Sequence, residues 1–301
     1  LGIDFGTDTC CVYALVDGAD TPELVPSRRG TSPTPSVVAF RPDGTIDIGH
    51  DAASRAATNA EHTVVGAKRL LGRKFYAGEV TWLREAFPAA LTPASNGDLW
   101  LRVGQRTVSP QEIAGLLLGH LKELAEERYQ TAVEGAVLAV PVCFDELERR
   151  ALLEACQLAE LPVIALCHEP TALARAFVAQ TKQFKSRVAI LDLGAGCLDV
   201  AIFETSIGSM RVTASRGDTL LGGLDLDRRL VELMNEAFLG REGIDLLNDP
   251  TARMRLFEVA RRVRHELSLA PRSSSVELQA IADRAGVQLR LRHPGFAREV
   301  A

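Results

Sequence analysis

Short apolar runs alternate with longer amphipathic stretches along the chain. Two runs, 136–140 and 163–166, are apolar throughout and bounded by Gly or Pro, a pattern typical of buried strands. Further strand-like segments lie at 2–5, 10–16, 188–193, 199–203 and 210–215. In the last of these, Met210, Val212 and Ala214 alternate with polar residues, which predicts that one face of the strand is buried.

The helical stretches start at recognisable N-terminal sequences. Residues 109–112 (Ser-Pro-Gln-Glu) form a capping box with Pro at the first helical position, and 145–148 repeats the box. The apolar stripe that follows the first cap consists of Ile113, Leu116, Leu117, Leu121 and Leu124. Pro170 and Pro250 predict two more helices, over 171–180 and from 250 onward. Strands that alternate with helices in this way indicate an α/β architecture.

One strand–turn–strand unit occurs twice. Asp4-Phe5-Gly6, followed by Val12, recurs as Asp192-Leu193-Gly194, followed by Val200, at a constant offset. Each copy places a carboxylate at the end of a strand, immediately before a glycine turn. Two matching hairpins predict a duplicated fold with two lobes that face each other across a cleft.

These hairpins carry the first candidate site. Turns built on Gly6 and on 194–196 let backbone N–H groups approach an anion closely, as in phosphate-binding nests. Asp4 and Asp192 would then lie beside phosphates, where a bridging Mg²⁺ held through its water shell makes chemical sense, and Asp199 can join the same shell. The alternative is an ordinary pair of tight hairpins with Asp at turn positions. The residues alone leave both interpretations open.

Two other charged residues are candidates. Lys68 lies in the basic stretch 66–73, which is equally compatible with a solvated helix face. Glu169 precedes Pro170, where a carboxylate can also act as a helix N-cap. We interpret His168 as a packing or capping residue. The six histidines show no spacing typical of a catalytic triad or of metal ligation.

Composition narrows the class of protein. The chain has 301 residues, 47% of them hydrophobic, and a net charge of −5, as in an ordinary soluble globular protein. The acidic balance argues against nucleic acid as the main partner, and no apolar run is long enough to span a membrane. No signal peptide is visible, although the chain opens at Leu1. The six cysteines form no CxxC pair and lie mostly in apolar runs, so we expect buried thiols in a reducing cytoplasm.

Several stretches together resemble the ATPase domain of the heat-shock protein 70 family (DnaK-type chaperones), within the actin-like superfamily. They are LGIDFGTDTCCVYAL (1–15), GAKRLLGRKF (66–75), the segment 140–177 with its EPTA turn, VAILDLGAGCLDVAIFE (188–204) and GDTLLGGLDLDRRL (217–230). The hairpins alone would fit any actin-like protein, sugar kinases included, but 66–75, 217–230 and the EPTA turn favour this family. The resemblance implies an actin-like (ribonuclease H-like), two-lobed ATPase fold with duplicated α/β lobes around a nucleotide cleft.

The resemblance also implies roles for individual residues, with ATP or ADP and Mg²⁺ as cofactors. The metal and its waters would be held by Asp4, Asp192 and Asp199. The β- and γ-phosphates would be cradled by Gly6, Thr7, Asp8, Thr9, Gly194, Ala195, Gly196 and Cys197. Lys68 and Glu169 would orient the attacking water, with Lys68 also stabilising charge on the γ-phosphate. The nucleoside side would be bordered by Gly222, Gly223, Arg261, Arg264, His265 and Ser268.

By the same resemblance, we expect hydrolysis of ATP to ADP to drive a chaperone cycle in the cytoplasm. Lobe closure would act on an attached C-terminal peptide-binding domain, with Pro141 and Arg149 at the relay positions. The implied partners are unfolded polypeptides, J-domain proteins and nucleotide-exchange co-chaperones, with neither nucleic acid nor membrane among them. The rival expectations are a non-hydrolysing nucleotide sensor or scaffold, a small-alcohol or sugar kinase, and a plain α/β domain that binds no nucleotide.

Four departures from the family pattern fall inside the candidate site. Ala195 adds a methyl group where backbone would approach phosphate, and Cys197 replaces a hydroxyl by a weak S–H donor. Asp8 replaces a neutral residue in the first loop and would repel phosphate unless it points away. Arg261 stands where the family has Glu. We therefore expect nucleotide binding to be retained and hydrolysis to be slower or differently regulated.

The resemblance further predicts the domain boundaries. The first lobe would cover 1–181, with 34–109 as its outer subdomain. The second lobe would cover 182–301, with 222–301 as its outer subdomain, and the polar stretch 180–187 would join the two lobes. The family's closing segment would follow Ala301, so we expect a fragment of a longer protein, in which the second inner sheet is unfinished.

Overall fold

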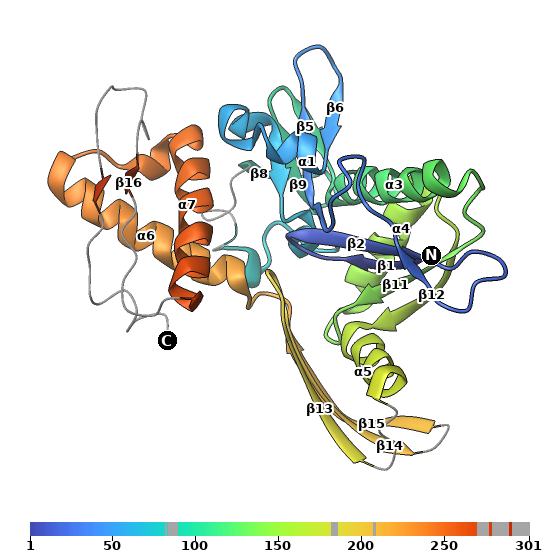
Figure 1. Ribbon diagram of the computed structural model, residues 1–301. Coiled ribbons are helices and arrows are strands. Elements are labelled where there is room, and N and C mark those ends of the chain that lie inside the picture. Colours follow the sequence, from blue (N-terminus) through green and yellow to red (C-terminus); the bar gives the residue numbers. More distant parts are fainter. Residues whose placement is uncertain are drawn as a thin grey trace.

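The computed structural model describes residues 1–81, 83, 90–181, 186–206 and 209–269, together with the backbone of two short paired strands, β16 (Glu277–Leu278) and β17 (Leu289–Arg290). It is a mixed α/β structure in two lobes (Figure 1). The linking stretch 180–187 lies partly outside the described residues, and the predicted lobe boundaries stay predictions.

The first lobe is built on a six-stranded sheet. Its strands are β1 (Gly2–Phe5), β2 (Thr9–Ala14), β3 (Glu23–Leu24), β4 (Thr34–Pro35), β11 (Ala136–Val140) and β12 (Val163–His168). The order is β12-β11-β1-β2-β3, with β4 beside β2, and β1, β11 and β12 are parallel neighbours. Two helices, α3 (Pro110–Tyr129) and α4 (Glu146–Leu158), supply the main apolar core behind it. Both begin at the predicted capping boxes, of Ser109 and Asp145.

Two small antiparallel sheets lie outside this core. One contains β5 (Val37–Phe40), β6 (Ile46–Ile48) and β7 (Thr63–Val65), with the short helix α1 (His50–Ala53) beside it. The other contains β8 (Ala90–Pro93), β9 (Leu99–Val103) and β10 (Arg106–Val108). Four 3₁₀ turns connect these parts, namely η1 (Ala56–Thr58), η2 (Ala60–His62), η3 (Ala67–Leu70) and η4 (Gly78–Val80).

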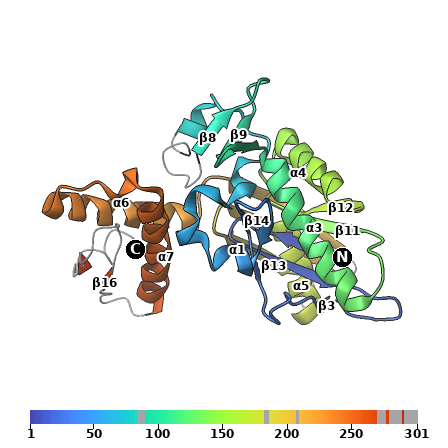
Figure 2. The same ribbon diagram turned by 90° about the horizontal axis from the view of Figure 1, so that it is seen from above.

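The second lobe has a sheet and a separate helical pair. The sheet consists of β13 (Ser186–Leu193), β14 (Leu198–Ser206) and β15 (Ser209–Asp218), and helix α5 (Glu169–Thr181) packs between it and β11–β12 (Figure 1). The helical pair is α6 (Gly223–Glu242) and α7 (Pro250–Leu269), joined through η5 (Leu246–Asn248). It has its own apolar core and lies to one side of the first lobe in both views (Figures 1 and 2).

The two predicted hairpins pair in the same register. Asp4 lies opposite Cys11 in the first hairpin, and Asp192 lies opposite Asp199 in the second, with all four pairs of the first hairpin repeated 188 residues later. The internal repeat in the sequence is therefore a structural repeat. It places two carboxylate-bearing strand ends and two glycine turns at corresponding positions of the two lobes.

Some local predictions are corrected. The strand predicted over 10–16 spans Thr9–Ala14, and α5 begins at Glu169, two residues before the prediction. The buried face predicted for 210–215 is wrong, because Val212 is 44% exposed and only Met210 packs against the core. The alternation is present, but no layer of the described structure covers Val212. Of the six cysteines, Cys10, Cys156 and Cys197 are buried, whereas Cys11, Cys143 and Cys167 are half-buried.

Candidate functional site

The two glycine turns line one cleft of about 430 Å³ between the lobes. Most of the residues singled out from the sequence line it, namely Asp4, Gly6, Thr7, Asp8, Thr9, Lys68, Glu169, Asp192, Gly194, Ala195, Gly196, Cys197, Gly223, Arg264 and His265. Asp199, Gly222, Arg261 and Ser268 do not line this cleft. That the cleft binds a nucleotide stays a prediction.

The turns of the two hairpins contact each other. A Cβ on Gly196 would overlap the Thr7 side chain, with 2.8 Å to its Cβ, so the second turn approaches the first only as glycine. Gly6 is restricted likewise, because its Cβ would overlap the carbonyl of Thr9. The Ser36 hydroxyl donates to the Gly6 carbonyl at 2.7 Å and so fixes the first turn from outside. Both turns are therefore closely packed, and only glycine fits at these two positions. That their N–H groups bind an anion stays a prediction.

The start of α6 packs against the second turn. A Cβ on Gly222 would lie 2.6 Å from the carbonyl carbon of Ala195 and 2.7 Å from the nitrogen of Gly196. The Gly223 N–H donates to the Gly194 carbonyl at 3.0 Å, and the Leu224 N–H donates to the Ala195 carbonyl at 2.8 Å. Gly222 is thus a support of this turn rather than part of the cleft wall.

Three aspartates concentrate negative charge beneath the turns. Burial raises the pKa of Asp4 and of Asp192, with the nearby charge of Glu169 adding to the rise in both. Asp199 is 1% exposed, and burial raises its pKa to about 6 even though the Val142 N–H donates to its carboxylate at 3.1 Å. A cation in the cleft would relieve this accumulated charge.

The donor set fits a hydrated magnesium ion. Among the described residues, no three His, Cys, Asp or Glu side chains lie close enough to form a metal site by themselves. Mg²⁺ does not need such a cage, because it usually keeps several waters and binds one or two carboxylates together with substrate phosphates. Asp4 and Asp192, which line the cleft, would serve in this way. Asp199 is buried outside the cleft and accepts a hydrogen bond from the Val142 N–H, so its predicted place in the metal's water shell stays a prediction.

Lys68 and Glu169 form an ion pair in the wall of the cleft. The Lys68 Nζ lies 2.7 Å from Glu169 Oε1, and the two side chains are only 4% and 14% exposed. Burial alone would lower the pKa of Lys68, but the attraction of Glu169 and Asp4 raises it, so the ammonium stays charged. The alternative of a solvated basic face is wrong, because the side chains of Lys68, Arg69 and Arg73 are all buried. Only the next cation, Lys74, is exposed, at 52%.

The predicted nucleoside-contacting residues divide between two environments. The Arg264 guanidinium is held by the buried carboxylate of Asp227, with N–O distances of 2.6 and 3.1 Å, and faces the cleft beside Gly223. His265 also lines the cleft. Ser268 is exposed, and its hydroxyl donates to the Arg264 carbonyl one turn earlier on the same helix.

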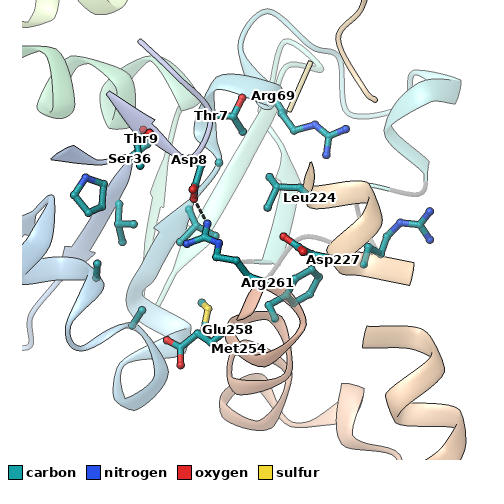
Figure 3. Close-up of a pocket in the computed structure, with 18 of the residues that line it drawn as sticks. Thr7, Asp8, Thr9, Ser36, Arg69, Leu224, Asp227, Met254, Glu258 and Arg261 are labelled. Carbon is teal, nitrogen blue, oxygen red and sulfur yellow. Dashed lines mark hydrogen bonds and ion pairs between the residues drawn. The ribbon is translucent and has the colours of Figure 1, made fainter. Parts of the chain in front are cut away.

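Asp8 and Arg261, two of the departures, are bonded to each other. The Arg261 guanidinium donates to the Asp8 carboxylate across the lobes (Figure 3). Both residues line a second cavity of about 220 Å³, with apolar walls that include Val65, Leu224 and Phe257. The repulsion expected between Asp8 and phosphate is therefore offset by a neighbouring cation.

Sequence reasoning missed several supporting residues. Ser36 fixes the first turn, Asp227 holds Arg264, and Arg69 contacts Asp225 near the N-terminus of α6. Arg73 donates to both Glu148 and Thr219 and so joins three parts of the chain. Arg69 and Arg73 lie in the quoted 66–75 stretch, but their partners lie 75 to 156 residues away and carry no local pattern.

No helix in the described part of the chain combines the length and the apolar character needed to cross a bilayer. The family comparison gives a direct match: the family model described as Hsp70 protein matches residues 1–293. That match covers both hairpins, the ion pair of Lys68 and the helices of the second lobe. The chain therefore belongs to the Hsp70 family and contains its nucleotide-binding, chaperone-type domain.

Proposed function

We propose that this domain binds Mg-ATP in the cleft between the two glycine turns and hydrolyses it to ADP and phosphate. The observation that carries the proposal is the buried pair of Lys68 and Glu169, which lines one cleft together with the two glycine turns and the carboxylates of Asp4 and Asp192. Members of the Hsp70 family are typically ATPases, which supports the same reaction.

The chain's own residues would act mainly by positioning and charge. The turns at Gly6 and Gly196 would hold the phosphates through backbone N–H groups. Lys68 would stabilise charge on the γ-phosphate, and Glu169 would hold both Lys68 and the attacking water in place. The water oxygen forms a bond to the γ-phosphorus as the bond to the ADP oxygen breaks. Mg²⁺, when bound, would neutralise the phosphate oxygens beside Asp4 and Asp192.

A non-hydrolysing nucleotide sensor is the second candidate, and Cys197 favours it. The Cys197 side chain is buried, and burial raises its pKa to about 11, so it is a neutral thiol at pH 7. A thiol is a weak donor compared with the hydroxyl of the family pattern. Ala195 accepts a backbone hydrogen bond from Leu224, which constrains the same turn.

Single-turnover hydrolysis of Mg-ATP separates these two candidates. The variants are Lys68→Ala and Glu169→Gln, with Lys74→Ala as the matched control, because Lys74 lies in the same stretch but is exposed. We expect the first two to lose about a hundredfold or more in rate, in line with removal of an electrostatic stabiliser, and the control to keep the wild-type rate. Tight ATP binding without turnover in the wild type would favour the sensor.

The proposal extends to a chaperone cycle in which lobe closure drives a peptide-binding domain. Arg149 supports a relay role, because it donates to the carbonyl of Phe144 and contacts the His168 ring at 3.1 Å, directly before Glu169. Unfolded polypeptides, J-domain proteins and exchange factors are the partners this cycle would need. ATP-dependent release of a bound peptide by the full-length protein, lost in Lys68→Ala, would test the cycle.

A further inference from the structure

The helical pair of the second lobe closes over the cleft against the first lobe. Met254 of α7 is buried in a small apolar cluster with Ala56 and Ala60, which lie in η1 and η2 of the first lobe. This contact lies beside the 220 Å³ cavity, which the two lobes line together. Among the described residues, no larger apolar cluster joins α7 to the first lobe.

One ion pair crosses the lobes at the same place. Arg261 of α7 donates to Asp8, which is 253 residues earlier and lies in the first turn (Figure 3). Asp8 lines the predicted nucleotide cleft as well as the second cavity, so the pair lies on the boundary between them. The side chains are 45% and 33% exposed, so water reaches the pair and weakens the attraction between the two charges.

Hydrogen bonds hold the chain in place next to both residues of this ion pair. The Asp8 carbonyl accepts from the Ser36 N–H at 2.8 Å, and the Ser36 hydroxyl holds the neighbouring Gly6. On the other side, Arg264 is fixed one turn along α7 by the buried Asp227. The pair therefore links the first turn to α7 at two positions whose neighbours are held in place.

We propose that Asp8 and Arg261 form a latch that holds the lobes closed over a bound nucleotide and limits the rate of its release. This inference rests on the proposed nucleotide site and adds its regulation. A partly exposed ion pair contributes modestly, so its loss should speed release about threefold to fivefold. Because such a pair is screened by salt, the latch also makes the rate of nucleotide release sensitive to ionic strength.

The test measures release of a fluorescent ADP analogue by stopped-flow displacement. The protein variants are Arg261→Met, Asp8→Asn and the charge exchange Asp8→Arg with Arg261→Asp. Arg262→Met is the matched control, because Arg262 is the exposed neighbour of Arg261 on α7. Each variant is measured at about 0.05 M and 0.5 M salt, where the screening length falls from more than 10 Å to a few Å.

We expect both single variants to release the analogue threefold to fivefold faster than wild type at low salt, with a smaller response to salt, and the charge exchange to recover slow release. The latch would be overturned, with the nucleotide function intact, by either of two results. One is release from Arg261→Met at the wild-type rate, and the other is release from the charge-exchange variant as fast as from the single variants. If wild type does not bind the analogue at all, the proposed nucleotide function fails, and the latch fails with it.

Discussion

Arg69 holds both carboxylate oxygens of Asp225 across the lobes, with Nη2 at 3.1 and 2.9 Å. The same carboxylate accepts the Gly222 N–H at 2.8 Å, and Gly222 packs directly on the second glycine turn. Arg69 follows Lys68 in sequence, so one short 3₁₀ turn supplies the proposed catalytic ammonium and the support of the phosphate turn opposite it.

We predict that Arg69→Met lowers stability and activity together. The Arg69 side chain is 3% exposed, so its removal leaves the Asp225 carboxylate without this buried partner, at a cost of about 2 to 4 kcal/mol. Urea unfolding measures the loss, and single-turnover hydrolysis measures the effect on the turn. The paired change Arg69→Met with Asp225→Leu removes both charges and should recover much of the stability but not the activity. Recovery of both stability and activity in the paired variant would show that the second glycine turn does not need the contact between Arg69 and Asp225.

Asp199 gives a pH-dependent prediction. Its pKa is about 6 in the folded protein, against about 3.9 in an unfolded chain, so the folded state binds the proton more tightly. Ionisation of Asp199 therefore lowers the free energy of unfolding. This loss of stability is absent well below pH 4, grows between pH 4 and pH 6, and reaches its full value above pH 6. We expect metal-free and nucleotide-free Asp199→Asn to be more stable than wild type by about 3 kcal/mol at pH 7.5, and by about half of that at pH 5. Urea unfolding at the two pH values checks this, and an advantage that did not grow with pH would contradict it.

Gly222→Ala should weaken nucleotide binding without unfolding the protein. The backbone of Gly222 is extended, which any residue adopts, so the effect comes from the added methyl group pressing on Ala195 and Gly196. We expect the Kd for ATP, measured by calorimetry, to rise about tenfold, equivalent to about 1.4 kcal/mol. Gly240→Ala is the control, because a Cβ there meets nothing within 4 Å and helix propensity favours Ala. Equal affinities in the two variants would show that the turn tolerates displacement.

Cys197→Thr tests the altered phosphate turn. Threonine restores a hydroxyl donor of similar size at a buried position beside the proposed γ-phosphate site. We expect single-turnover hydrolysis to accelerate by about threefold to tenfold, as for addition of one donor to a developing charge. A rate equal to that of wild type would remove the cysteine as a cause of slow turnover.

Local patterns in the sequence predicted the strands that carry the two hairpins and the helices α3, α4, α5 and α7, but not the two small sheets or α6. The hairpins that carry Asp4 and Asp192 are defined by strand, turn and glycine within a few residues, and the structure reproduces their repeat in register. The capping boxes at Ser109 and Asp145 are equally local and were confirmed. The resemblance to the family supplied Lys68 and Glu169 as one group, although they are 101 residues apart.

The sequence did not predict which charged residues, far apart along the chain, form ion pairs with each other. The 66–75 stretch contains four cations, but composition does not say that Arg69 faces Asp225 while Lys74 faces solvent near Asp98. Asp8 alone predicted repulsion of phosphate, and Arg261 alone was a departure from the family pattern. Only their contact shows that the two departures form one ion pair. The exposed Val212 shows another limit of the sequence. Alternation predicts that the apolar residues share one face of a strand, but it does not say whether another element covers that face.

The separate apolar cores of the first lobe and of the α6–α7 pair have a calorimetric consequence. The contacts between these parts are mostly charged, and the apolar cluster at Met254 is small, so parting them exposes little apolar surface. Heat-capacity changes scale with the apolar surface that becomes hydrated. Opening of the cleft should therefore have a small heat-capacity change, and its enthalpy should vary little with temperature while the lobes themselves stay folded.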